Sequence, residues 1–194
     1  MYPFFLRLSR VMAVLGGLML TFLIVMVCVS ILGRSLNGIL HSDGVMAAMP
    51  GMAEWLLAFG IGPINGDFEM VETGVAFAIF AFLPLCQITG GHASVDIFTS
   101  KLSARTNRLL QMLIDLLFAF VLVVIAVQLF GGLQSKLRSG QTTLILEIPV
   151  WWGYAICMLG AVTAAVVGVY VAVTRIREVA TGEAILTQME GADH

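Results

Sequence analysis

The chain has 194 residues, of which 59% are hydrophobic and only 11% are charged, and its mean hydropathy is +0.99. In a soluble domain roughly a quarter of the residues are charged, so this composition excludes a soluble protein and indicates an integral membrane protein. The net charge of −2 gives no reason to expect nucleic acid as a partner.

Four apolar segments are long enough to cross a bilayer, which takes about 20 residues of helix. They predict an all-α integral membrane protein in which residues 1–194 form a single four-helix membrane domain. The expected spans are approximately 11–35, 69–90, 106–133 and 149–174. A long loop over 36–67 separates the first two spans, and a polar tail over 175–194 follows the last. The first span is longer than a signal-peptide core and lacks a small-residue cleavage pattern, so we expect it to be retained.

The basic residues predict the orientation. With four crossings, most of them fall on the side of the N-terminus: Arg7, Arg10, Lys101, Arg105, Arg108, Arg175 and Arg177. Because lysine and arginine accumulate in cytoplasmic loops, both termini are predicted to be cytoplasmic. The loop over 36–67 is then an outer loop.

Two features are expected in and after this outer loop. Pro50 can begin a short helix that continues through Trp55 and Phe59. That helix would lie flat at the membrane interface, where tryptophan is common, or offer a surface to a partner. After a turn at Asn65, Asp67 is expected to cap the second span.

The segment after the second span is polar but has a helical pattern. Ser94 can cap a helix, and Val95, Phe98 and Leu102 form one apolar stripe. The pattern predicts a short amphipathic helix over about 94–102 in the inner interface. Phe98 and Leu102 are candidate contacts with a partner protein.

The fourth span begins with aromatic residues and continues with a stripe of small ones. Trp151, Trp152 and Tyr154 are typical of an aromatic belt at the outer face, and a substrate-binding aromatic box is the alternative. The small residues recur every four positions, and they are Gly160, Ala164, Gly168 and Ala172. Such a stripe allows close approach of a second helix, which is another span of this chain or a partner protein.

Polar residues within the spans are the candidates for function. Asp115 lies inside the third apolar segment, where a lone carboxylate is costly. Arg108 lies seven positions earlier on the same helical face and is long enough to reach it, whereas a partner contact and ion coupling are the functional alternatives for Asp115. Glu72 and Gln87 can reach the interfaces, and Gln128 is expected to bond between helices.

Nothing in the chain has the pattern of an active site or of a metal centre. There is no nucleophile–base pair and no phosphate-binding loop. His92 lies near the inner interface and His41 in the outer loop, so they cannot converge on a metal or haem. The cysteines Cys28, Cys86 and Cys157 lie in apolar runs and predict buried, inert thiols. We therefore expect no enzymatic activity, no catalytic residue, no bound metal and no cofactor.

Two motifs resemble those of a transporter subunit. The first is a Gly-His-x-x-Val-Asp segment after the second span, formed here by Gly91, His92, Val95 and Asp96. The second is an Ile-Pro-x-Trp-x-x-Tyr segment at the head of the fourth span, formed by Ile148, Pro149, Trp151 and Tyr154. Together with four spans over roughly 11–177, they resemble the small permease subunit (DctQ-type) of tripartite ATP-independent periplasmic (TRAP) transporters.

The resemblance implies a non-catalytic scaffold in the bacterial inner membrane. In this family a separate large permease subunit carries the substrate and sodium sites. A periplasmic binding protein delivers the solute, often an organic acid, and the sodium gradient drives the complex. The implied partners are thus the large permease subunit, the binding protein and membrane lipid.

Two other functions remain open. The chain could be a self-sufficient four-span transporter that works as a homo-oligomer, which would require a membrane-embedded acid such as Asp115. It could also be an accessory subunit of a redox complex, which would require haem or quinone ligands.

Overall fold

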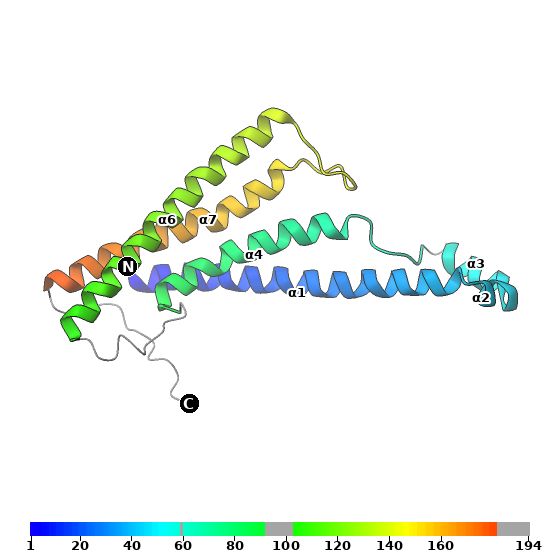
Figure 1. The fold of residues 1–194 in the computed structure, drawn as a ribbon, viewed down its shortest axis with the longest axis horizontal. Helices are drawn as coiled ribbons and strands as arrows, with labels where there is room; N and C mark the ends of the chain where they lie inside the picture. Colours follow the sequence, from blue (N-terminus) through cyan, green and yellow to red (C-terminus); the bar gives the residue numbers. More distant parts are fainter. Residues whose placement is uncertain (59, 92–102, 182–194) are drawn as a thin grey trace.

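The computed structural model describes residues 1–58, 60–91 and 103–181, and these residues form an all-α fold (Figure 1). Its helices are α1 (Tyr2–Leu40), α2 (Asp43–Ala48), α3 (Pro50–Ala58), α4 (Asp67–Thr89), α6 (Ala104–Ser139) and α7 (Trp151–Thr181). Four of them, α1, α4, α6 and α7, are long and apolar enough to cross a membrane. The prediction of an all-α protein with four candidate spans is confirmed.

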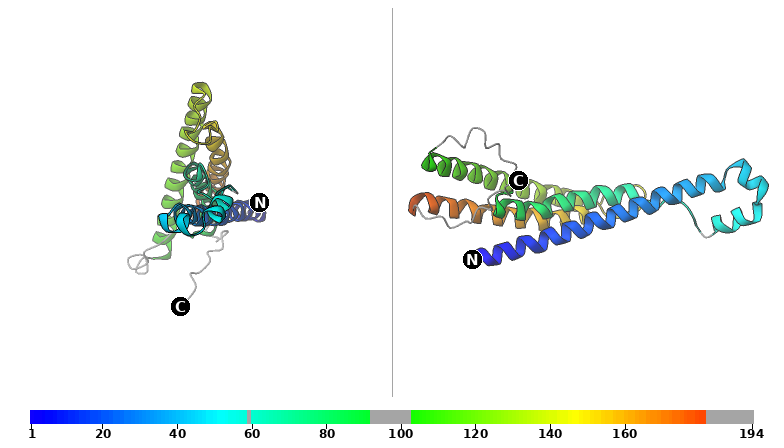
Figure 2. Two further views of the ribbon diagram at one scale, coloured as in Figure 1. Left: turned by 90° about the vertical axis from the view of Figure 1, so that its right-hand side faces the viewer. Right: turned by 90° about the horizontal axis from the view of Figure 1, so that it is seen from below.

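The four long helices stand in a row, in the order α1, α4, α7, α6. α4 packs between α1 and α7, and α7 packs between α4 and α6. Figures 1 and 2 show α1 and α6 at opposite edges of the row. Half of the apolar stretch of α7 is therefore buried, compared with 17% of the stretches in α1 and α6. The two edge helices leave most of their apolar surface open.

One end of the row gathers the N-terminus, the end of α4, the start of α6 and the end of α7 (Figure 2). The basic residues predict that this end faces the cytoplasm. We call it the inner end and the opposite end the outer end.

Small residues on α7 explain how closely its neighbours approach. A Cβ on Gly160 would lie 2.8 Å from the Cβ of Phe80 in α4, and one on Gly168 would lie 3.0 Å from Leu122 in α6. Ala164, between them, is fully buried. The sequence did not decide whether this small-residue stripe packs against another span or against a partner protein. In the structure it packs against other spans of this chain. Gly160, Ala164 and Gly168 are not partner contacts, because neighbouring spans already cover them.

α1 is much longer than the span predicted within it. Its 39 residues measure about 58 Å at 1.5 Å per residue, whereas the hydrocarbon core is about 30 Å thick. The loop predicted over 36–67 therefore begins only after Leu40, where α1 ends. It contains α2 and α3 at the outer tip of α1 (Figure 1). α3 confirms the short helix predicted from Pro50, and Phe59 lies outside the described residues.

The inner connection between α4 and α6 is described only at its start. Gly90 has a positive φ of 64° and ends α4, and the amide of Gly91 then donates to the carbonyl oxygen of Cys86. The predicted interfacial helix over 94–102 lies outside the described residues, and so do His92, Val95, Asp96, Phe98 and Leu102.

Candidate functional site: a charged cluster joining three spans

A cluster of polar side chains joins α4, α6 and α7 near the inner end. The Nε of Arg175 in α7 donates to Oδ2 of Asp115 in α6 at 3.0 Å. The Nη1 of the same arginine donates to Oε2 of Glu178 at 2.8 Å. Gln87 of α4 donates from Nε2 to the other oxygen of Asp115 at 3.3 Å. Asp115 on α6 therefore bonds to both α4 and α7.

The cluster is enclosed by the helices that form it. Gln87 and Glu178 are 2% and 4% exposed, and the side chains of Arg175 and Asp115 are 14% and 15% exposed. Removing one member of such a pair leaves a buried charge uncompensated, which is strongly destabilising. We interpret the cluster as a set of polar contacts that stabilises the packing of helices whose other contacts are apolar.

The partner of Asp115 differs from the one that the sequence suggested. We expected Arg108, on the same helix, but the structure brings Arg175 to Asp115 from 60 positions away. The reason is that α7 continues as a helix to Thr181, through residues predicted to be a polar tail. Spacing along one helix predicts neighbours on that helix only, so it could not reveal this pair. Gln87, expected at the interface, is buried.

The cluster lies next to a stretch of α6 that is long enough to cross the bilayer. Asp115 bonds to Gln87, which lies in the last turn of α4. The α6 segment that follows, 116–135, holds about 20 uncharged residues before Lys136, the length of one bilayer crossing. A crossing over 116–135 would place Asp115 at its inner boundary.

At the outer end, a carboxylate of α4 holds the loop between α6 and α7. Glu69 accepts hydrogen bonds from the backbone amides of Ile145 at 2.8 Å and Leu146 at 3.1 Å. A bridge between Thr142 and Pro149 closes the base of the loop. Pro149 therefore lies just before α7 and not in its first turn. The role of Glu69 could not be predicted from the sequence, because its partners are backbone amides, which every residue type except proline provides.

A second outer contact joins α1 to α4. The hydroxyl of Ser30 donates to Oδ2 of Asp67 at 2.6 Å, and a nitrogen of Arg34 lies 3.6 Å from the same oxygen. Gly66 occupies the cap position predicted for Asp67. Asp67 instead ties two spans together one residue into the helix.

The aromatic residues of α7 separate into two roles. A Cβ on Gly132 of α6 would lie 2.7 Å from the ring of Tyr154, so Tyr154 packs against a neighbouring span. The rings of Trp151 and Trp152 meet edge to face with centroids 6.0 Å apart, and Trp152 is 52% exposed. Trp152 is thus available to an interface, as expected of a belt residue.

The cysteines and the groups that could bind a metal are placed as follows in the described part of the chain. No disulfide joins the cysteines among the described residues, and Cys157 is buried, whereas Cys28 is exposed on α1, contrary to the expectation of buried thiols. Among residues 1–58, 60–91 and 103–181, no three His, Cys, Asp or Glu side chains are grouped to hold a metal ion.

The model of one protein family, described as "Tripartite ATP-independent periplasmic transporters, DctQ component", matches residues 47–178. The chain belongs to this family. The protein is therefore a small permease component of a TRAP transporter, as its two motifs suggested. The match extends from α2 to α7 and includes the whole charged cluster. Comparison with curated proteins and with solved structures returns no match.

Proposed function

We propose that this TRAP component is a scaffold that braces a separate large permease subunit in the bacterial inner membrane, with both of its termini in the cytoplasm. The complex imports an organic acid that a periplasmic binding protein delivers, and the sodium gradient drives it. The large subunit carries the substrate and sodium sites.

The orientation of Gln128 is the observation that carries this proposal. Gln128 lies near the middle of the crossing segment of α6, its side chain is exposed, and it makes no hydrogen bond within the described chain. The sequence predicts that Gln128 bonds between helices, and no helix among the described residues supplies that bond. An amide without a partner in hydrocarbon is costly, so a polar group from another polypeptide is the better neighbour.

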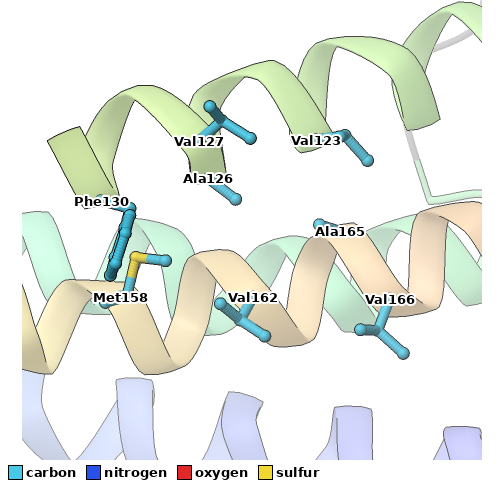
Figure 3. A pocket seen from close by; sticks show the side chains of 8 residues that line it. All are labelled: Val123, Ala126, Val127, Phe130, Met158, Val162, Ala165 and Val166. Atoms are coloured by element: carbon cyan, nitrogen blue, oxygen red, sulfur yellow. The ribbon is translucent and has the colours of Figure 1, made fainter.

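A second feature of the α6 edge, on another face of the helix, also suits a membrane-embedded partner. An apolar groove of about 300 Å³ runs between α6 and α7 (Figure 3). Val123 and Val127 line its α6 side, and Val162 and Val166 line its α7 side. Because α6 is an edge of the row, both this groove and the other face of α6, which carries Gln128, are open to a permease subunit.

The charged cluster also favours a scaffold over an independent transporter. Asp115 is occupied on both oxygens, by Arg175 and Gln87. A carboxylate held in this way serves packing better than the binding and release of a cargo ion.

Gln128→Leu is expected to weaken assembly without harming the isolated subunit. Leucine is compatible with lipid, whereas loss of an interhelical hydrogen bond costs about 1 kcal/mol, or roughly fivefold in affinity. The measurement is the amount of large, multi-span permease that co-purifies with the tagged subunit from native membranes in mild detergent.

Gln134→Leu is the matched control for this experiment. It makes the same change on an exposed position of α6, but near Lys136 and the outer end, where water can satisfy the amide. Recovery equal to the unmodified subunit is expected. Purification of the folded, unmodified subunit without any permease would refute the scaffold function itself.

Asp115→Asn distinguishes the scaffold from the self-sufficient transporter. In the scaffold, the substitution weakens the contact with Arg175 and lowers the amount of assembled complex, while uptake per assembled complex is unchanged. In a transporter that uses this acid, uptake is abolished although the protein is present. The measurement is sodium-driven solute uptake in sealed vesicles, normalised to complex, with the small subunit alone as the blank. Accumulation by the subunit alone would contradict the proposal.

A further inference from the structure

A second groove, of about 630 Å³, lies in the outer half of the row. α4 contributes one face of it, α1 lines it with Met19, Phe22 and Leu23, and α7 lines it with Trp152 and Ile156. Its lining is mostly apolar, as in grooves that take hydrocarbon. None of its lining residues is lysine, arginine or histidine.

The outer end of the groove is closed by a loop, which we call the roof of the groove. The loop between α6 and α7 covers its outer end with Thr143, Leu146 and Ile148. Glu69 holds this loop through two backbone hydrogen bonds. The space is therefore maintained by defined contacts and is not a loosely packed gap.

The length of the groove matches one leaflet. Its α4 lining runs from Glu69 to Phe80, about 16 Å at 1.5 Å per residue, or half of the bilayer core of about 30 Å. A transmembrane helix in this groove would have to continue to the outer membrane surface, and the loop between α6 and α7 would block it there. An acyl chain needs only to enter from the side and end at mid-depth.

A carboxylate marks the mouth of the groove. Glu72 lines it, is exposed, and has no hydrogen bond or ion pair within the described residues. Thr73 lies next to it in the lining. Because Glu69 adds a second carboxylate, the mouth repels lipids with net negative charge and attracts a headgroup that carries an ammonium. A primary ammonium has three N–H donors for carboxylate and hydroxyl oxygens.

From the depth, the apolar walls and the acidic mouth, we infer that this groove binds a phosphatidylethanolamine molecule, with an acyl chain between α1 and α7 and the ammonium of the headgroup at Glu72. The lipid fills space that the row leaves open in the outer leaflet. The inference does not depend on the scaffold function, because the groove is formed within this chain.

Native mass spectrometry of the purified full chain, with the partners that co-purify, tests this inference. The protein is extracted from membranes that contain phosphatidylethanolamine and phosphatidylglycerol. The unmodified subunit is expected to retain one phospholipid with a preference for phosphatidylethanolamine. Glu72→Gln is expected to reduce that preference by about tenfold, because a charge-assisted contact becomes a neutral one.

Two further variants complete the experiment. Ala76→Phe places a ring into the groove from α4 and is expected to abolish retention of the lipid. Glu54→Gln removes an exposed acid on α3, outside the groove, and is expected to change nothing. Retention with no headgroup preference in the unmodified subunit, an equal preference in Glu72→Gln, or a permease segment cross-linked to position 72 would each overturn the inference.

Discussion

Replacing Arg175 with methionine is expected to lower the free energy of unfolding of the purified subunit by about 3–5 kcal/mol. The substitution keeps a long apolar side chain but leaves Asp115 and Glu178 without the guanidinium that bridges them. Both acids are largely enclosed, so water can stabilise them only if the helices separate. Unfolding in mixed micelles, followed by loss of helical signal, measures the change.

Arg177→Met is the matched control, because Arg177 lies two positions away on α7 and is exposed. Its effect is expected to stay within about 0.5 kcal/mol. Adding Asp115→Asn to Arg175→Met should recover part of the loss, since it removes one of the uncompensated charges. Equal effects of Arg175→Met and Arg177→Met would show that the cluster does not stabilise the fold.

The second large effect is expected for Gly160→Val. A Cβ at this position would lie 2.8 Å from the Cβ of Phe80 and 3.0 Å from the backbone carbon of the same residue. A backbone atom cannot rotate away as a side-chain end can, so α4 and α7 must separate. Overpacking of this kind costs about 1–3 kcal/mol or more, and here it acts between the two central helices.

Gly17→Val is the control for Gly160→Val, because nothing lies within 4 Å of a Cβ at Gly17. It places the same side chain in the apolar stretch of an edge helix, where lipid can accommodate it. The two variants are compared by thermal unfolding in one detergent. A Gly160→Val protein as stable as Gly17→Val would mean that α4 and α7 do not pack as described.

The sequence was sufficient for those features that depend on local composition. Apolar length predicted four spans, because a predominantly apolar segment of about 20 residues is stable as a helix in a bilayer. Pro50 predicted the start of α3, since proline favours the first helical turn. The two motifs predicted the family, which the family match over 47–178 confirmed.

The candidate site depended on pairings that no local pattern contains. Arg175 was assigned to a polar tail, yet it is the partner of Asp115. Gln128 was expected to bond between helices, yet its side chain is exposed and no helix among the described residues bonds to it. In both cases, the position of the residue along its own helix did not identify its bonding partner. The partner depends on which faces of helices distant in sequence pack together.

Hydropathy, which is a property of single helices, was sufficient to indicate a helical protein with four candidate membrane spans, and the two local motifs indicated its transporter family. Only the tertiary structure decided that the helices form a row. That arrangement turned the small-residue stripe inward, brought Asp115 to Arg175, and left Gln128 and Glu72 facing outward. The physical reason is that the energy of a side chain at membrane depth depends on what lies across from it, and its neighbour is supplied by a helix remote in sequence.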